Sequence, residues 1–423
     1  MGNGDKYKRA IKVGKEMLDD YFFKCFSRTK AQYFTKELKM SFKDIMLFIL
    51  NMPKKTLQIE LNNFFNSVLK RDDSITKQAY SDARQKIKPE AFIALNDSLN
   101  KVFYEEFDDY KVWNGYRLSA IDGSVLEIPN TEQLRNEFGY VSNLHTKTAK
   151  AMSSCIYDVQ NKFVIKSKID RYDCSERKMA KDLILEMKKG GEKQDLILFD
   201  RGYPSAEFID FLFENKIDFV MRCQRNTFKA VTDAKNEDQI VKLKYKNKVY
   251  SVRVLRFILS SGEAEVLITS LLNSEFTVED FRKLYFFRWG IEIKFDGLKN
   301  KLEIENFTGT TKIAIEQDFY ASIYLSNMAE LARQQSDEKV EKNHKDKEIK
   351  HQYKTNLNVL IGTLKDKFVL MLLEESKRKR NKIYNEIMKQ ISQSIVPIRS
   401  ERHNERFKSK SLEKYKRNSK RCL

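Results

Sequence analysis

The expected fold depends most on one stretch, from Gln194 to Cys223, which reads QDLILFDRGYPSAEFIDFLFENKIDFVMRC. Residues 196–199 are continuously apolar and are followed by Asp200, a pattern typical of a short strand buried on both faces. Residues 205–216 carry apolar side chains at helical spacing, and residues 217–223 form a second apolar run. A strand, a helix and a strand in this order predict a sheet with helices packed against it.

The preceding residues extend this sheet. Residues 116–130 predict two short strands joined by a turn that begins at Asp122, and residues 153–170 predict two more strands around a polar turn. Residues 174–189 predict a helix that is closed by a pair of glycines. The pattern over residues 117–223 is therefore β-β-β-α-β-α-β, which indicates a mixed sheet.

Helical patterns precede and follow these strands in the sequence. Within the helical residues 1–112, residues 76–88 place four cations around a small apolar set: Lys77, Arg84, Lys86 and Lys88. This segment is either a DNA-recognition helix or a solvated basic helix. Residues 224–272 predict a β-rich insertion whose last strand rejoins the sheet. The C-terminal third is helical again, with a charge-dense linker at 336–354 and a basic tail after Pro397.

Composition limits the classes of partner. The chain has 423 residues, a formal net charge of +19, 41% hydrophobic and 12% aromatic residues, so it can bury a core and is expected to bind a polyanion, nucleic acid before a membrane surface. No run of 18 residues is apolar and the first residues lack a secretory signal pattern, so no membrane-spanning helix is expected. The five scattered cysteines and four histidines indicate free thiols in a reducing cytoplasm rather than a Cys/His metal site.

A charged segment, YFFRWGIEIKFDGLK at residues 285–299, carries the candidate site. On a single helix at about 100° per residue, four polar side chains fall within about 60° of one another and the opposite side is apolar. These four residues are Tyr285, Arg288, Glu292 and Lys299. The segment is either a solvated face with an Arg288–Glu292 ion pair or a row of groups that binds a ligand.

Two aspartates elsewhere in the chain favour a ligand site. Asp122 and Asp200 each follow an apolar run and have a glycine close behind. Each alone is more often a turn residue, but together they would lie at the sheet edge where ligands bind in open α/β folds. With a carboxylate from a neighbouring helix they suit two Mg²⁺ ions about 4 Å apart, which activate an attacking oxygen and stabilise a leaving oxygen in phosphodiester transfer.

At these residues the chain resembles the DDE transposases of bacterial insertion sequences, in the insertion-sequence-four family. The matching pieces are AIDGS around Asp122, LILFDRGYPS around Asp200, and the Tyr-x2-Arg-x3-Glu-x6-Lys spacing of the family's Y-R-E-K signature. IENFTG and QDFYASIYLSNMAE look like the usual continuation, so the resemblance covers about residues 40–375. The two aspartate motifs are weak singly, whereas the signature behind them in the right order is specific.

The resemblance implies a ribonuclease-H-like α/β fold, with a mixed sheet, flanking helices, a β-rich insertion and helical terminal regions. It implies that Asp122, Asp200 and Glu292 are the catalytic residues and bind two Mg²⁺ ions, for which Mn²⁺ can substitute. Asp296 lies on the same helical face and competes for the role of third acid, but Glu292 has the family spacing.

Further residues are implied as DNA contacts. Tyr285, Arg288 and Lys299 would hold phosphates beside the scissile bond. Trp289 either stacks on a displaced base or packs in the core, the latter being the commoner place for a tryptophan. Arg201 follows Asp200 and is expected, like Tyr203, to contact DNA or to support the acid.

The implied function is DNA transposition. A homodimer would bind the terminal inverted repeats of an insertion sequence in the bacterial cytoplasm, cleave double-stranded DNA and join the ends to target DNA, without a membrane or a small-molecule substrate. Two alternatives are a domesticated, non-catalytic DNA-binding protein on the same scaffold and a nuclease without strand transfer. None of the three acids is replaced, which disfavours the domesticated protein.

The expected organisation has five regions. They are a helical N-terminal DNA-binding region at 1–112, the first part of the catalytic core at 113–223, the β-rich insertion at 224–272, the rest of the core with the Glu-bearing helix at 273–335, and a helical C-terminal region with a basic tail at 336–423.

Overall fold

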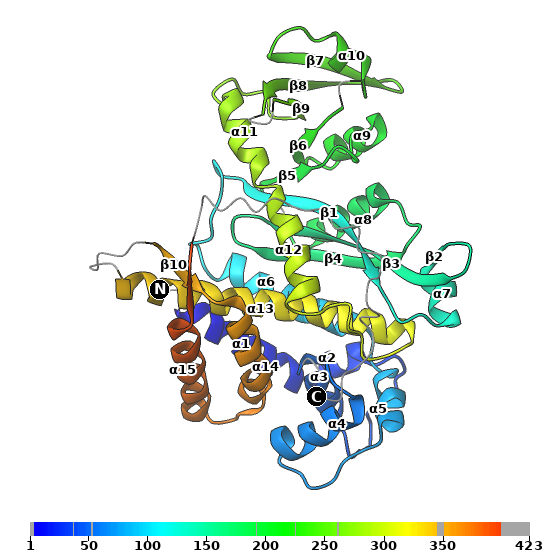
Figure 1. Ribbon diagram of the computed structural model, residues 1–423, viewed down its shortest axis with the longest axis vertical. Coiled ribbons are helices and arrows are strands. Elements are labelled where there is room, and N and C mark those ends of the chain that lie inside the picture. The colour runs from blue at the N-terminus through cyan, green and yellow to red at the C-terminus, as the bar shows by residue number, and fades with distance from the viewer. Residues whose placement is uncertain are drawn as a thin grey trace. The chain divides into compact units, whose positions relative to one another are not determined.

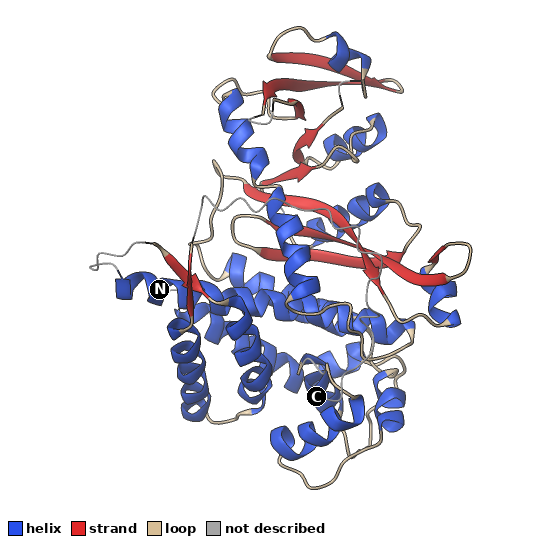
Figure 2. Ribbon diagram, in the orientation of Figure 1, coloured by secondary structure: helices blue, strands red, loops and turns tan. Residues whose placement is uncertain are grey.

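The computed structural model describes residues 4–36, 38–51, 54–191, 193–224, 226–259, 262–344 and 351–398. They form two compact units (Figure 1, Figure 2). The sheet unit consists of Asp109–Leu126 and Ala151–Asp296, and the helical unit consists of Met1–Asp108, Glu127–Lys150 and Gly297–Leu423. The basic tail expected after Pro397 lies, from residue 399 onward, outside the described residues.

Nine strands of the described chain form one mixed sheet. Their order is β2-β3-β1-β5-β6-β9-β8-β7, with β4 also paired to β3. The strands are β1 (Arg117–Glu127), β2 (Tyr140–Ser142), β3 (Lys147–Asp158), β4 (Phe163–Arg171), β5 (Asp195–Phe199), β6 (Asp218–Arg222), β7 (Asp238–Tyr245), β8 (Lys248–Ile258) and β9 (Ala264–Thr269).

The directions of the central strands match the expected fold class. β1, β5 and β6 are parallel, and β3 pairs antiparallel with β4. β3 also runs antiparallel to β1, because Ser153 Oγ donates to Ser124 O while Val159 N, further along β3, donates to Leu118 O. The ribonuclease-H-like mixed α/β fold is thus confirmed, and all five residues of β5 are buried as its apolar run predicts.

The expected turn at Asp122 is wrong. β1 is one strand of 11 residues that passes through Asp122 and Gly123 without reversing. The neighbouring strand β3 holds this part of β1 extended, because Ser154 Oγ donates to Asp122 O at 3.0 Å. An Asp-Gly pair favours a turn only where no adjacent strand supplies partners for an extended backbone.

The helices of the sheet unit include those expected at residues 174–189 and 205–216. They are α8 (Glu176–Lys189), α9 (Ala206–Glu214), α10 (Lys229–Asp233), α11 (Val278–Phe286) and α12 (Trp289–Asn300). α8 packs on β4 and α9 on β6, while the mainly β insertion returns to the sheet because β9 pairs antiparallel with β6. α11 begins at the capping box of Thr277 and Asp280, each of which accepts a hydrogen bond from the backbone N–H of the other.

The single helix expected over residues 285–299 is wrong, because two helices, α11 and α12, share this segment. The break lies at Phe287 and Arg288, where backbone hydrogen bonds span three residues instead of four, as from Arg288 N to Tyr285 O. Just beyond it, a side chain at Gly290 would approach Val159 to 3.6 Å. The tight turn therefore lies beside a close approach of α12 to the β3–β4 hairpin.

The helical unit is built around the long helix α13 (Lys312–His344), which packs against α6 (Glu90–Glu105) and α1 (Gly4–Asp19) (Figure 1). Its other elements are α2 (Tyr21–Ser27), α3 (Phe42–Leu50), α4 (Leu57–Asn63), the π-helix η1 (Phe64–Leu69), α5 (Lys77–Arg84), α7 (Glu132–Phe138), α14 (Leu357–Leu373), α15 (Lys377–Gln393) and the paired strands β10 (Tyr353–Thr355) and β11 (Ile395–Pro397).

One local expectation in the helical unit is corrected, and one segment left open is described further. The charge-dense linker expected from residue 336 is helical as far as His344, because Ser336 and Val340 are buried and give this stretch a packed face. Residues 345–350 lie outside the described residues. α5, in the segment considered as a recognition helix, directs Arg84 into the protein, where the residue is 1% exposed. Across the described chain, no helix has the length and apolar character needed to cross a membrane.

Candidate active site

Asp122 and Asp200 are brought together by the register of two parallel strands. β1 pairs with β5 at a constant offset, from Arg117 opposite Asp195 to Ala120 opposite Leu198. The pairing ends at Ala120 and Leu198, and the same offset continued by two residues would bring Asp122 level with Asp200, the residue after β5.

The two aspartates differ in the hydrogen bonds that their carboxylate oxygens accept. Asp122 Oδ1 accepts a hydrogen bond from Gly123 N at 2.8 Å. Asp200 Oδ1 is buried and has no hydrogen-bond partner within the described chain. A buried carboxylate oxygen without a donor is costly, so it points to a ligand at this position.

Arg288 connects Asp122 to Glu292. Its guanidinium is 3% exposed, with Nη1 at 3.8 Å from Asp122 Oδ2 and Nη2 at 2.8 Å from Glu292 Oε1. The predicted Arg288–Glu292 ion pair therefore exists, and its Arg288 side chain is buried beside Asp122. The helix break at Arg288 lets this side chain lie among the strands.

The carboxyl group of Asp122 is held in an unfavourable environment for negative charge. Burial raises the pKa of Asp122 to about 6, against the hydrogen bond from Gly123 and the charge of Arg288, which lower the pKa. The neighbouring carboxylates of Glu176 and Asp200 raise the pKa further. Acids that repel one another in a partly buried place are typical of functional sites.

The donor set suits a hard cation, although no three acidic, histidine or cysteine side chains of the described residues converge on one point. Arg288 lies between Asp122 and Glu292, which keeps these two carboxylates apart. The orphaned Asp200 Oδ1 and the raised pKa of Asp122 fit oxygen ligands of Mg²⁺ or Mn²⁺. Asp122 and Asp200 would hold such an ion, and Glu292 is the third candidate.

The other predicted residues are placed differently from one another. Tyr285 is buried, its hydroxyl donates to Phe199 O at 3.3 Å, and burial raises the pKa of this phenol. Trp289 is 42% exposed, so the expectation that it packs in the core is wrong, and the Arg288 guanidinium lies 4.8 Å from its ring. Arg201 is exposed. Lys299 belongs to the helical unit, where its Nζ lies 3.9 Å from Glu305 Oε1.

The contacts also separate Glu292 from its rival. Asp296 has an exposed side chain, whereas Glu292 is joined by Arg288 to Asp122. The position of Glu292 supports its choice as the third acid over Asp296.

Two further residues belong to this region. Glu176 was not predicted from the sequence, and Tyr203 was expected only to contact DNA or to support Asp200. Glu176 is the first residue of α8, and its Oε1 would lie 3.2 Å from a side-chain carbon added at Gly123. Tyr203 is 1% exposed, and its hydroxyl has no partner within the described chain. The only sequence signal for Glu176 is an acid at the start of the helix between β4 and β5, which is also a common helix-stabilising choice.

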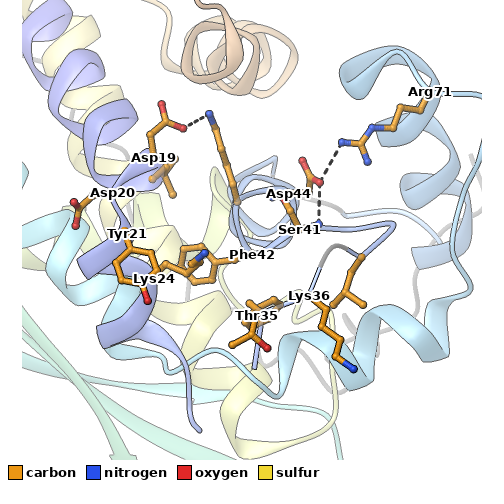
Figure 3. A pocket seen from close by; sticks show the side chains of 14 residues that line it. Asp19, Asp20, Tyr21, Lys24, Thr35, Lys36, Ser41, Phe42, Asp44 and Arg71 are labelled. Atoms are coloured by element: carbon orange, nitrogen blue, oxygen red, sulfur yellow. Dashed lines mark hydrogen bonds and ion pairs between the residues drawn. The ribbon is translucent and has the colours of Figure 1, made fainter. Parts of the chain in front are cut away.

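A pocket in the helical unit is the alternative place for a ligand (Figure 3). It has a volume of about 810 Å³ and lies around the ends of α1 and α3. Its three acids are all satisfied: Asp19 by Lys15 and Lys43, Asp20 by the backbone of α2, and Asp44 by Ser41 and Arg71. Because its acids already have partners within the protein, this pocket offers fewer free carboxylates than the edge of the sheet.

Comparison with known proteins identifies a family for this chain. A family model described as a transposase DDE domain matches residues 113–328, a range that includes Asp122, Asp200 and Glu292. No curated protein sequence matches the chain.

Two solved structures are similar over part or most of the chain. The piggyBac transposase synaptic complex with hairpin DNA has a TM-score of 0.46 and 10% identity, covering 89% of this chain and 85% of that one. The Mos1 transposase paired-end complex with the left transposon end has a TM-score of 0.18 and 14% identity, covering 40% of this chain and 59% of that one. Both likenesses are weak, and the family assignment rests on the family model.

Proposed function

The chain belongs to the transposase DDE domain family, and from this premise we propose that it is the transposase of a bacterial insertion sequence of the insertion-sequence-four family. It would bind the terminal inverted repeats of its element, cleave the DNA with the help of divalent cations and transfer the ends to target DNA. The observation that carries the proposal is the shared register of Asp122 and Asp200, with Arg288 joining Asp122 to Glu292.

The three acids have the central role in this proposal. Asp122, Asp200 and Glu292 would hold two Mg²⁺ ions, which supply a Lewis acid and an activated oxygen for attack on a phosphodiester. The carboxylates must be ionised to bind a cation, so the raised pKa of Asp122 means that binding of the ion competes with a proton below about pH 6.

The cationic and aromatic residues have the task of positioning DNA. Arg288 is adjacent to Asp122 and Glu292, so once these acids have another cation, its guanidinium is available to a phosphate beside the scissile bond. The exposed Trp289 offers a flat surface for a base, and the exposed Arg201 follows Asp200. Tyr285, with its hydroxyl on Phe199 O, holds α11 against β5 instead of contacting a phosphate. Lys299 keeps its proposed role as a second phosphate contact.

The reaction would proceed in two attacks at phosphorus. In the first, a water oxygen attacks the bond at the transposon end, the bond to the 3′ oxygen breaks, and a 3′-hydroxyl is released. In the second, that hydroxyl attacks a phosphodiester of the target, so that one bond forms for each that breaks. Two copies of the chain would bring the two ends together, and the net charge of +19 favours binding of both DNA partners.

A pair of variants on α12 tests the assignment of the third acid. Glu292→Gln is expected to lose cleavage of inverted-repeat DNA by roughly a thousandfold or more while DNA binding is kept, because the charge that holds the cation is removed. Asp296→Asn, four residues further on the same helix, is the matched control and is expected to cleave normally. Wild-type cleavage by Glu292→Gln would refute the proposed centre, and loss confined to Asp296→Asn would make Asp296 the third acid.

A nuclease is separated from a transposase by the second reaction. Pre-cut ends with a free 3′-hydroxyl, incubated with the chain, Mg²⁺ and a supercoiled plasmid, are expected to become joined to the plasmid. Cleavage of intact ends without any joining of pre-cut ends would make the protein a nuclease.

A further inference from the structure

The side chain of Glu176 lies against the catalytic part of β1. A carbon added at Gly123, the residue after Asp122, would lie 3.2 Å from Glu176 Oε1 and 3.3 Å from its Cδ. Gly123 therefore leaves the room that the Glu176 carboxylate occupies. The consequence is that a second negative charge is held next to Asp122.

The start of α8 is fixed at this edge of the sheet by the residue after Glu176. Arg177 donates from Nε at 3.0 Å and from Nη2 at 2.8 Å to Gly202 O, in the loop that follows Asp200. This double contact joins the first turn of α8 to the loop beyond β5. Glu176 is thereby kept near both strands that carry the catalytic aspartates.

No cation of the described chain neutralises Glu176. Its carboxylate makes neither a hydrogen bond nor an ion pair there, while the nearby bases are engaged elsewhere, Arg177 with Gly202 and Lys181 with Glu207. Arg288, whose charge lowers the pKa of Asp122, pairs with Glu292. Two carboxylates side by side in a partly buried place repel each other, which costs stability unless a cation lies between them.

A buried tyrosine adjoins these acids. Tyr203 is 1% exposed and packs on Phe199, but its hydroxyl has no hydrogen-bond partner in the described chain. Tyr203 N donates to Asp200 O at 3.1 Å, and the pKa of the phenol is raised by burial and further by the charges of Asp122, Glu176 and Asp200. An unpartnered buried donor beside three acids indicates that an atom is to be held among them.

We propose that Glu176 is a fourth acid of the catalytic centre and that, together with Asp122, it holds one of the divalent cations. The inference rests on the proposed function for its role in the reaction, but cation binding can be measured without DNA. A site of this kind is chemically reasonable because one or two carboxylates suffice to hold such a cation, with water and phosphate oxygens completing its shell.

Binding of Mn²⁺ to the full chain, followed by electron paramagnetic resonance, tests the proposal directly. Glu176→Gln keeps the size of the side chain and removes its charge, and it is expected to weaken Mn²⁺ binding by roughly 10- to 100-fold. Glu186→Gln is the matched control, because Glu186 lies on the same helix and pairs only with Lys189 on the surface. Equal Mn²⁺ affinity in wild type and Glu176→Gln would overturn the proposal.

Thermal unfolding distinguishes a cation ligand from a structural residue. Without divalent cations, Glu176→Gln is expected to melt at the wild-type temperature or above it, because repulsion with Asp122 is relieved. With saturating Mn²⁺ the wild type is expected to gain more stability than the variant, since binding to the folded state stabilises it. A variant that melts lower than wild type in the absence of cations, with its Mn²⁺-induced gain intact, would show a structural role and overturn the proposal.

The DNA reaction separates this proposal from the proposed function. If wild type and Glu176→Gln need the same Mg²⁺ concentration for half-maximal cleavage and bind Mn²⁺ alike, the fourth acid is wrong and the transposase stands. If Mn²⁺ binding depends on Glu176 but the wild type cleaves no inverted-repeat DNA, the cation site stands and the proposed function fails. A wild type that binds no Mn²⁺ overturns both.

Discussion

Arg84 in the helical unit and Asp200 in the sheet unit are charged residues with buried polar atoms, and their surroundings are opposite. Arg84 is 1% exposed and donates to Gln317 Oε1, Thr308 Oγ1, Ala314 O and Asp318 Oδ1 at 2.6–3.2 Å. Asp200 has a buried oxygen without a partner, beside Asp122, whose pKa is raised. The first arrangement is complete within the protein, and the second is not.

This difference separates a structural charge from a functional one. A buried ion pair whose hydrogen bonds are all made holds its neighbours in one arrangement. Carboxylates left without cations lower the stability of the fold, so their retention is best explained by a ligand. Removing the charge of Arg84 should therefore lower the stability of the fold, and removing the charge of Asp200 should leave that stability unchanged or raise it.

The largest effect is expected from Asp200→Asn. Loss of this carboxylate should reduce cation-dependent cleavage by roughly a thousandfold or more, because several kcal/mol of transition-state stabilisation depend on the cations that it holds. The free energy of unfolding in cation-free buffer should stay the same or rise. Cleavage rates and urea unfolding measure the two quantities, and a large loss of stability would place Asp200 in the same class as Arg84.

The next largest effect is expected from Arg84→Ala. It would leave Asp318 buried without its cation and should lower the free energy of unfolding by about 3–5 kcal/mol. Lys77→Ala, an exposed residue on the same helix, is the control and should change this free energy by less than about 0.5 kcal/mol. Equal stability of the two variants would mean that the buried cluster has no structural role.

A third contrast lies in the dependence of stability on pH. The pKa of Asp122 is raised from 3.8 to about 6, so the folded state holds this proton more tightly than the unfolded state. Without cations, the wild type should therefore lose roughly 2–3 kcal/mol relative to Asp122→Asn as pH rises from about 4 to above 6.

The contribution of Asp318 to stability depends on pH with the opposite sign. Burial raises its pKa, but Arg84 and the hydrogen bonds from Thr308 outweigh burial, so the pKa of Asp318 is lowered and its stabilisation is lost as pH falls. Urea unfolding of wild type and Asp122→Asn at several pH values measures the first slope. A stability difference between the two proteins that does not change with pH would contradict the raised pKa of Asp122.

The smallest effect is expected from the tryptophans. Trp289→Ala should weaken binding of transposon-end DNA by about 1–3 kcal/mol, the usual contribution of a stacked base, with little change in stability because the ring is 42% exposed. Trp113→Ala is the matched control. Trp113 packs on Phe276 within the sheet unit, so its removal should lower stability and leave DNA affinity unchanged. DNA affinities from fluorescence anisotropy decide the matter, and equal affinity of wild type and Trp289→Ala would exclude stacking.

The elements that the sequence predicted well are those with strong local patterns. The apolar run of β5 and the helical spacing of α9 appear as expected. The last strand of the insertion, β9, also rejoins the sheet. In each of these cases the local pattern and the tertiary environment favour the same structure.

The predictions that were wrong concern residues whose conformation or burial is set by a neighbouring element. β3 keeps Asp122 and Gly123 extended, the β3–β4 hairpin lies beside the break before α12, and α13 contributes the partners that bury Arg84. Glu176 escaped notice because an acid at the start of a helix is common, and only its position over Gly123 distinguishes it. Periodicity along the chain does not report contacts of this kind.

The proposal that this protein is a cation-dependent transposase can be tested with a DNA duplex that carries the terminal inverted repeats flanking its own gene. With the full chain and Mg²⁺, we expect breaks that leave a 3′-hydroxyl at the repeat ends. Cleavage should be lost with a chelator and in each of the variants Asp122→Asn, Asp200→Asn and Glu292→Gln, while all four proteins bind the duplex. Tight binding without cleavage by the wild type, or cleavage that survives these substitutions, would contradict it.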